Sequence, residues 1–294
     1  MPRTPSHILG LACLLVTAVF FGSCEDNPVR PQARQRPACW EPLNPPPLND
    51  LGVADDDPVW STNGRQILFR SDYDSCNDFS SGIYIIDKDG LNRQPVPDLF
   101  SVYKWLPGDT QLLVNIGVFS GGELAVFDLQ TSTLEKLGVL TSIPRFDLSM
   151  DGTYAYIVGD SGWIYEYDLK TGESERIVQG SHPSISPDRS KVAYSTREGM
   201  NIFFRKDSSV VTFGRAGIAG DWALDGAEFF YSLSPDKIMR VDTLGNESFL
   251  TTGLRGPSIS PDGLELIYID ISDDRYFHVW SYDLLKDSKR QVTQ

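Results

Sequence analysis

Residues that catalyse reactions or hold metal ions are scarce in this sequence. It has three histidines and four cysteines among 294 residues, and no histidine lies between His7 and His182. A nucleophilic serine needs a neighbouring base, and a zinc site needs clustered nitrogen or sulfur ligands. No Gly-x-Ser-x-Gly segment is present either, which argues against a hydrolase domain. The sequence therefore favours neither a serine hydrolase nor a zinc protein.

Positive charge is also in short supply. Lys and Arg number 26 against 40 Asp and Glu, which gives a formal net charge of −14 at pH 7. Binding to nucleic acid requires a basic patch that neutralises phosphates. We therefore expect no nucleic-acid partner, and an acidic surface that favours cationic or neutral partners.

Long apolar runs are lacking, and the most apolar stretch lies near the N-terminus. The run Ile8–Phe21 follows Arg3 and is too short to span a bilayer, but it has the length of an export-signal core. It ends in Gly22-Ser23-Cys24, and residues 1–24 resemble the signal peptide of bacterial lipoproteins, in which the cysteine is acylated. This resemblance implies a lipid anchor at Cys24. An ordinary secretory signal with an incidental cysteine is the alternative.

A proline-rich tether is predicted for residues 25–54. This segment holds seven prolines and almost no apolar periodicity, which is typical of a semi-rigid spacer. After processing of the signal and acylation of Cys24, Cys39 and Cys76 remain. An even pair in an oxidising compartment predicts a disulfide, which would join the end of the tether to the first repeat. Two free thiols are the alternative.

Turn residues and strand formers are abundant. The chain has 25 Gly, 19 Pro and 11% aromatic residues, a mixture typical of short strands joined by turns. The segment Pro257–Gly263 contains Ser-Pro-Asp-Gly, in which proline presets φ, aspartate bonds its own backbone and glycine supplies a positive φ. The phrase returns at Pro183–Arg189, and weaker copies occupy Trp60–Gly64, Trp105–Asp109, Leu148–Gly152 and Trp222–Gly226.

These six turns recur about every 40 residues, which is the period of β-propeller blades. The equivalent residues in the six copies are Trp60, Trp105, Leu148, Ile185, Trp222 and Ile259. Because leucine and isoleucine fill the position in three copies, we expect the three tryptophans to be core residues and not ligand platforms.

Each repeat divides into four strands. Second strands are expected at segments such as Gln66–Ser71, third strands at segments such as Ile83–Asp87, and short fourth strands at segments such as Leu134–Leu137. Several third strands are nearly continuous apolar runs, which indicates sheets covered on both faces. We predict an all-β fold: a six-bladed β-propeller of four-stranded antiparallel blades over residues 55–294, with no helix longer than two turns.

Residues 58–294 resemble the WD-like, Pro-Asp-Gly repeats of the TolB-type β-propeller family. The phrases that carry the resemblance are Ser71-Asp72-Tyr73-Asp74, the strand and turn Gly82–Gly90, and Ser260-Pro261-Asp262-Gly263. The family usually has six blades, as counted here. TolB itself has an additional N-terminal domain, for which the tether leaves no room, so the resemblance implies the fold and not the role of TolB.

The best candidate binding residues precede the aligned position on the innermost strands. This position reads Val59, Lys104, Asp147, Ser184, Asp221 and Ser258. If these side chains line the channel mouth, Lys104, Asp147 and Asp221 form a polar ring that binds a peptide or a sugar. The alternative is that they bond turns in neighbouring blades.

Two further motifs have a structural explanation beside a functional one. Gly159–Gly162 spells the sequence around a trypsin-like nucleophile, but it lies between two predicted strands, where a tight turn is expected. Asp72, Asp74 and Asp78, with Asp55–Asp57 nearby in sequence, suggest an irregular calcium site, although the fifth and sixth positions of an EF-hand loop are not matched. A solvated acidic loop is the alternative, and no other cofactor is expected.

The leading hypothesis is a lipid-anchored, non-catalytic propeller that binds a protein or an envelope polymer at the cell envelope of a bacterium. It would be monomeric, touch the membrane only through its lipid anchor, and lie on the periplasmic face or at the outer membrane. A propeller enzyme that acts on a glycan or a small molecule at the central channel is the main alternative. A purely structural envelope module is the third.

Overall fold

The computed structural model describes residues 55–71, 82–97, 99, 102–117, 122–214, 218–233, 236–273 and 276–294. The predicted signal and tether, with Cys24 and Cys39, lie outside the described residues. So do Cys76 and the candidate calcium ligands Asp72, Asp74 and Asp78.

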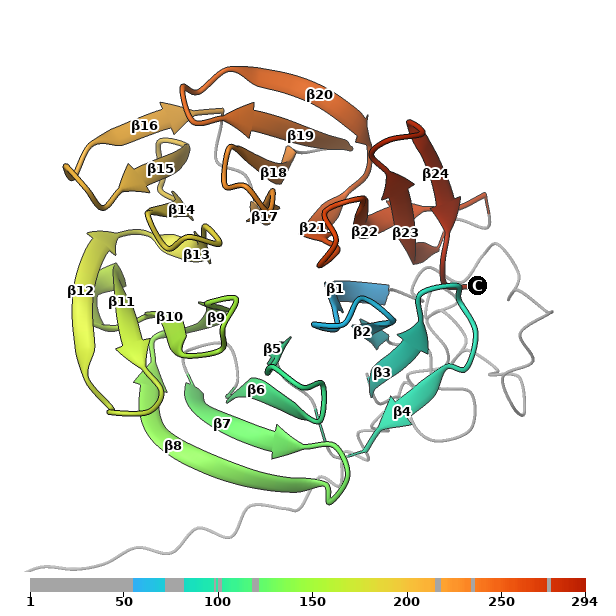
Figure 1. Cartoon of the computed structure of the whole chain (residues 1–294), viewed down its shortest axis with the longest axis horizontal. Coiled ribbons are helices and arrows are strands. Elements are labelled where there is room, and N and C mark those ends of the chain that lie inside the picture. The colour runs from blue at the N-terminus through green and yellow to red at the C-terminus, as the bar shows by residue number, and fades with distance from the viewer. Residues whose placement is uncertain are drawn as a thin grey trace, which may run out of the picture. The chain divides into compact units, whose positions relative to one another are not determined.

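Six four-stranded antiparallel sheets form the blades of a β-propeller (Figure 1), as the sequence predicted. In chain order, the blades are β1 (Asp55–Trp60), β2 (Gln66–Ser71), β3 (Gly82–Asp87) and β4 (Gln94–Val96); β5 (Val102–Trp105), β6 (Gln111–Ile116), β7 (Gly122–Asp128) and β8 (Thr133–Thr141); β9 (Ile143–Leu148), β10 (Tyr154–Val158), β11 (Trp163–Asp168) and β12 (Ser174–Gln179); β13 (Ser181–Ile185), β14 (Lys191–Ser195), β15 (Met200–Phe204) and β16 (Val210–Phe213); β17 (Ile218–Trp222), β18 (Glu228–Leu233), β19 (Lys237–Asp242) and β20 (Glu247–Thr252); and β21 (Arg255–Ile259), β22 (Glu265–Ile271), β23 (Phe277–Asp283) and β24 (Ser288–Gln291). Within each blade the first strand is innermost and the fourth outermost (Figure 1).

Helix is almost absent from the described part of the chain. One 3₁₀ turn, Asp160–Gly162, joins β10 to β11. It coincides with the Gly-Asp-Ser-Gly segment, which therefore forms the predicted turn, with Ser161 at φ 57°. No helix in the described residues has the length and apolar character needed to cross a bilayer.

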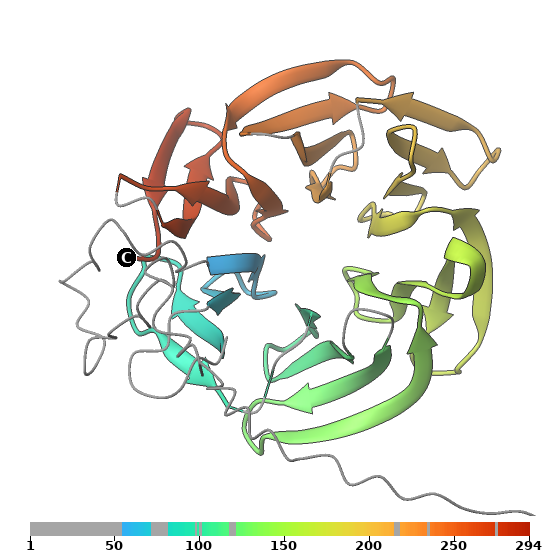
Figure 2. The ribbon, with the colours of Figure 1, turned by 180° about the vertical axis from the view of Figure 1, so that it is seen from behind.

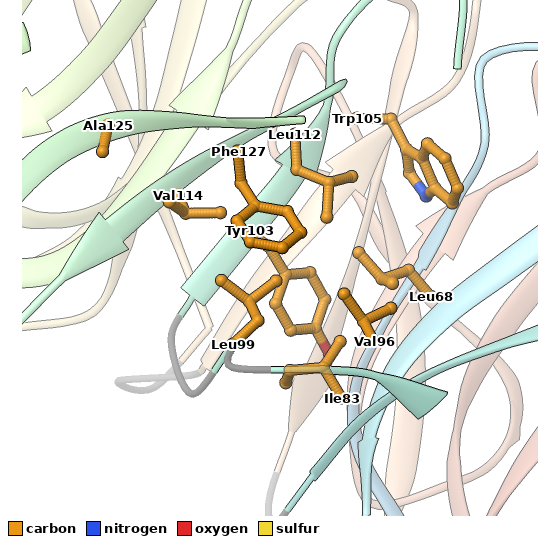
Figure 3. Close-up of a cluster of buried hydrophobic side chains, with 10 residues drawn as sticks. All are labelled: Leu68, Ile83, Val96, Leu99, Tyr103, Trp105, Leu112, Val114, Ala125 and Phe127. Carbon is orange, nitrogen blue, oxygen red and sulfur yellow. The ribbon is translucent and has the colours of Figure 1, made fainter. Parts of the chain in front are cut away.

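The hydrophobic core lies between successive blades. In the cluster of Figure 3, Leu68 and Ile83 of blade 1 pack against Leu112 and Phe127 of blade 2, and all four side chains are buried. Neighbouring blades cover both faces of each middle strand, which explains the continuous apolar runs in the sequence. The aligned tryptophans belong to this core, as predicted: Trp60 is 7%, Trp105 4% and Trp222 1% exposed.

The recurrent turn connects the first and second strands of every blade. In blade 6, Ser260 Oγ donates to Asp262 Oδ1 at 2.6 Å and accepts from Glu265 N at 2.9 Å, so the serine joins the turn to the next strand. Gly263 follows at φ 73°, in the left-handed region that favours glycine. In blades 2 and 4, Asp109 and Arg189 occupy the equivalent turn position, with φ angles of 55° and 58° in the same left-handed region.

Among the described strands, the ring closes without an exchanged strand, because each blade is built from four consecutive strands, including the first and the last. Seen from behind in Figure 2, β1 lies beside blade 6. The junction is made by side chains and close backbone packing. Thr293 Oγ1 donates to the buried Asp55 carboxylate. A Cβ atom on Gly90 would meet the Val292 carbonyl oxygen at 2.4 Å, so only glycine fits there.

Three consecutive aspartates at the start of β1 bind different blades. Beside the Asp55 contact with blade 6, Asp56 pairs with Arg70 of blade 1 at 2.7 Å and with Arg255 of blade 6 at 2.8 Å. Asp57 pairs with Arg145 of blade 3 at 2.6 Å. The two arginine-bound carboxylates thus have structural partners within the ring.

Candidate functional site

An axial channel runs along the six innermost strands and contains two cavities. The wide cavity has a volume of about 260 Å³ and opens among the turns between first and second strands, where Thr62, Met150 and Pro261 line it. The narrow cavity has a volume of about 90 Å³ and lies at the beginnings of the innermost strands, where Arg145 and His182 line it. Both cavities share five lining residues: Val59, Lys104, Asp147, Asp221 and Ser258. These five form the waist of the channel.

The three charged residues predicted from the sequence therefore come together at the waist. Lys104 Nζ lies 2.9 Å from Asp147 Oδ1. Asp147 Oδ2 accepts a hydrogen bond from Ile185 N of the next blade at 2.8 Å. The side chains thus line the channel and also tie one blade to the next, as the alternative interpretation expected, whereas the binding of a peptide or a sugar there stays a prediction.

Asp221 joins blade 5 to blade 6 in a similar way. Its Oδ2 atom accepts from Ile259 N at 3.0 Å and from Ser258 Oγ at 3.3 Å, and its Oδ1 atom accepts from Trp222 N at 2.9 Å. Asp147 and Asp221 occupy equivalent strand positions, and each accepts a backbone N–H of the following blade. The repeat therefore preserves the geometry of this bond.

The electrostatics of the waist are set by burial and by the shared lysine. Burial raises the pKa of Asp221 to about 6, with a further contribution from Asp147 and an opposing one from Lys104. For Lys104, burial alone would lower the pKa, but the carboxylates of Asp147 and Asp221 outweigh it and raise the pKa. Lys104 is therefore charged at neutral pH.

We predict that Asp221 makes stability depend on pH between about 4 and 6. The pKa of Asp221 is raised from 3.8 to about 6 in the folded state, so folding favours its protonated form. Its contribution to stability is present below pH 4 and is lost as the pH rises to 6, by about 2–3 kcal/mol. Chemical denaturation should show that the free energy of unfolding of the wild type falls by this amount between pH 4.0 and pH 6.5, relative to that of Asp221→Asn. Parallel pH profiles of the two proteins would contradict the prediction.

The narrow cavity contains residues that the sequence analysis did not single out. Tyr103 OH donates to the Asp57 carbonyl oxygen at 3.0 Å, beside the pair of Asp57 with Arg145. Burial, reinforced by Arg145, lowers the pKa of His182, so the imidazole is neutral at pH 7. Asp57 and His182 have positive φ angles of 48° and 52°, next to register shifts in β1 and β13. Such bulges redirect side chains and often lie beside functional sites.

A repeat-based signal for these residues exists in the sequence. Asp57, Arg145 and His182 all lie three positions before the aligned residues of their blades. An analysis restricted to the position immediately before the aligned residue misses this outer ring.

A second polar cluster joins blades 3 and 4 away from the channel. Glu166 pairs with Arg189 at 2.9 Å and with Arg205 at 2.5 Å, and Tyr156 OH donates to the same carboxylate. Although burial opposes ionisation, hydrogen bonds from Arg205, Tyr156 and Arg189 lower the pKa of Glu166. These partners also explain why blade 4 tolerates an arginine, Arg189, at a turn position that favours glycine. We assign this cluster to blade packing.

No group of three or more His, Cys, Asp or Glu side chains in the described ranges has the arrangement of a metal site. The Asp72–Asp78 segment proposed for calcium lies outside those ranges. Its calcium binding stays a prediction.

The described strands form a six-bladed β-propeller, and solved structures, TolB proteins among them, share this fold. The chain is similar to TolB from Acinetobacter baumannii, with a TM-score of 0.59 and 19% identity over 73% of this chain and 60% of that one. A putative TolB from Agrobacterium tumefaciens gives a TM-score of 0.55 and 16% identity over 72% of this chain and 87% of that one. An oligogalacturonate lyase in complex with manganese gives a TM-score of 0.52 and 18% identity over 84% of this chain and 80% of that one.

These similarities are at the level of fold. The chain spans less than two thirds of the length of the Acinetobacter protein. No protein-family model matches the sequence, and no curated protein matches it.

Proposed function

We propose that this protein is a lipid-anchored, non-catalytic propeller that binds a protein or an envelope polymer at the bacterial cell envelope through its wide cavity. The observation that carries the proposal is the wide cavity itself. The apolar aligned residues of all six blades line it together with serine and threonine side chains of the turns, and polar side chains from four blades converge at its floor. Concave apolar sites with a few placed polar groups are typical of binding pockets.

Exposed apolar side chains on the same face support this choice. In an antiparallel blade, the first-to-second and third-to-fourth turns lie at the same end. Large exposed hydrophobic residues occur on both kinds of turn: Leu91, Met150, Leu244, Leu264 and Leu285. Leu244 is 79% exposed. Exposed apolar side chains on the face that carries the wide cavity favour contact with another macromolecule.

The position of Asp55, where the described part of the chain enters the propeller, also favours the wide-cavity face as the binding face. The propeller begins at Asp55, at the end of β1 that borders the narrow cavity. A tether that precedes Asp55 would therefore join the propeller on the face away from the wide mouth. Such a connection would leave the wide cavity open to a partner.

The anchor itself gives a direct prediction. If Cys24 is acylated, cells fed a clickable fatty acid will label the wild-type protein, and Cys24→Ala will lose the label. The Cys13→Ala variant is the matched control, because Cys13 lies within the signal and its loss leaves acylation intact. Equal labelling of wild type and Cys24→Ala would contradict the anchor.

Site-specific photocrosslinking tests the binding face. A crosslinking amino acid at Met150, on the wide-mouth rim and 59% exposed, is expected to form a discrete adduct in intact cells. The same residue at Ile271, 50% exposed at the opposite end of β22, is the matched control and should form none.

The waist residues provide the second arm of this test. Replacement of Lys104, Asp147 and Asp221 together should abolish the Met150 adduct, provided that circular dichroism shows an intact fold. A persistent adduct in the folded triple variant, or an equal adduct from Ile271, would overturn the proposed binding site.

An enzyme that acts on a glycan or a small molecule is the second candidate, favoured by the narrow cavity. The neutral imidazole of His182 lies there beside Arg145, and a neutral imidazole is able to accept a proton. Turnover that is lost in His182→Ala, with the Met150 adduct retained, would favour this candidate over the binding module.

A further inference from the structure

The waist carries one more carboxylate than it has cations. Lys104 is engaged by Asp147 at 2.9 Å. Asp221, the second carboxylate, accepts hydrogen bonds only from uncharged donors, namely two backbone N–H groups and the Ser258 hydroxyl. Among the described residues, no Lys, Arg or His nitrogen lies within ion-pair distance of it. One negative charge at the floor of the wide cavity thus lacks a direct counter-ion.

We propose that the wide cavity receives a cationic side chain, a lysine ammonium or an arginine guanidinium from a partner polypeptide, and that Asp221 is the residue that pairs with it. The proposal rests on the binding role proposed above for this cavity, and it specifies the chemistry of the bound group. A carboxylate in a partly desolvated cavity is costly unless a cation neutralises it. An incoming cation would supply that partner.

The cavity walls suit such a side chain. Trp60, Trp105 and Trp222 line the cavity, together with Leu148 and Ile259. Lysine and arginine bury their methylene stems along apolar surfaces and place the charged end at a polar group. At about 260 Å³, the cavity accommodates a side chain or a short chain segment.

The other charged groups around the waist do not cancel the attraction of Asp221 for an incoming cation. On the narrow side, Arg145 is paired with Asp57 at 2.6 Å, and His182 is neutral at pH 7. On the wide side, exposed carboxylates of the turns surround the mouth: Asp151, Asp188, Asp225 and Asp262. Cations near this rim include Lys191, 3.7 Å from Asp188, and Arg189, which pairs with Glu166. Exposed Lys88, whose charge acts on Asp262, and exposed Arg65 also belong to this face. An acidic rim around an apolar cavity attracts cations toward it.

The first test uses blocked amino acids as probes. N-acetyl-lysine methylamide and N-acetyl-arginine methylamide are titrated into the folded propeller, and binding is followed by tryptophan fluorescence and calorimetry. N-acetyl-norleucine methylamide, which lacks the charge, is the control. We expect saturable binding of the cationic probes and at least tenfold weaker binding of the norleucine probe. Equal affinity for all three would overturn the proposal.

The pH dependence gives a second readout that needs no variant. Asp221, with a pKa of about 6, is ionised in only about one molecule in ten at pH 5. The affinity for the lysine probe should therefore fall about tenfold between pH 7.5 and pH 5.0. Loss of this pH dependence in Asp221→Asn would distinguish the titration of Asp221 from that of His182. Affinity that is constant over this range would contradict the proposal.

Two substitutions with opposite expected effects complete the test. Asp221→Asn should weaken binding of the lysine probe at least tenfold and abolish its pH dependence, whereas the rim control Asp225→Asn should bind like wild type. Lys104→Met should tighten binding, because Asp147 then also lacks its cation. An unchanged affinity in Asp221→Asn, with its fold verified by circular dichroism, would reject Asp221 as the receiving group.

The outcomes separate this inference from the proposed function. A Met150 adduct together with no binding of cationic probes to the folded wild type would reject the cationic ligand and retain the binding face. Probe binding without a Met150 adduct would support the cation site and reject the proposed contact with a macromolecule. If Asp221→Asn fails to fold, the wild-type pH profile and Lys104→Met decide the question.

Discussion

Replacing Trp222 with alanine will lower the free energy of unfolding by about 3–5 kcal/mol, the range for truncating a large aromatic core residue. Trp222 is 1% exposed, and its ring lies 5.2 Å from that of Phe229, centroid to centroid. Its Nε1 atom donates to the Ser184 carbonyl oxygen of the preceding blade at 3.1 Å. The substitution therefore opens a cavity between blades 4 and 5 and removes a bond that joins them.

Urea unfolding followed by circular dichroism measures this effect. Trp222→Phe is the control, because it keeps most of the apolar volume and loses only the indole N–H, so its cost should be clearly smaller. If urea unfolding gave Trp222→Ala the same free energy of unfolding as wild type, this position would not be part of the core.

Thr293→Val is expected to destabilise the propeller by about 3–5 kcal/mol, although valine has nearly the shape of threonine. Thr293 Oγ1 donates to the Asp55 carboxylate and accepts from Val279 N at 2.9 Å. Valine leaves both groups buried without this partner, and an unsatisfied buried group costs about 1–3 kcal/mol, or more when it is charged. Because Asp55 and Thr293 lie in the first and last blades, the substitution weakens the junction that closes the ring.

The matched control is Thr133→Val, since Thr133 is exposed on the outer strand β8 and bonds only to a nearby hydroxyl. That variant should remain within about 0.5 kcal/mol of wild type. Equal stabilities of the Thr293 and Thr133 variants would show that the Asp55–Thr293 contact does not stabilise the ring.

The sequence was informative where structure depends on local chemistry. The recurrent turn needs a left-handed residue, and glycine at positions such as Gly64 and Gly263 marks it directly. The apolar second and third strands follow from burial on both faces, and their predicted bounds agree with the structure to within a residue in examples such as Gln66–Ser71 and Ile83–Asp87.

One strand was predicted too short, for a specific reason. The sequence predicts a fourth strand at Leu134–Leu137, before Gly138, whereas β8 runs from Thr133 to Thr141. Gly138, at φ 72°, lies where the register between β7 and β8 shifts. The glycine accommodates a bulge within the strand and does not end it.

Contacts between distant parts of the chain were accessible only through the repeat. Alignment of the blades brought Lys104, Asp147 and Asp221 together, because equivalent positions on the innermost strands face a common axis. The Asp55–Thr293 contact follows no repeat rule, since it is made once and joins residues far apart in sequence. Asp57 and Arg145 occupy one repeat position, but the repeat does not show that these two side chains pair with each other. The sequence also did not show that the channel divides into a wide and a narrow part.

If the proposed anchor tethers the propeller, the three aspartates at the start of β1 have a mechanical consequence. Tension on a tether would reach the ring at Asp55, where a strand held by a single backbone ladder would be peeled away bond by bond. Here the first residues of the strand are bound by Thr293 and Arg255 of blade 6 and by Arg145 of blade 3. A pulling force would therefore be shared among several blades at once and resisted in parallel, so that the domain yields as a whole at a high force.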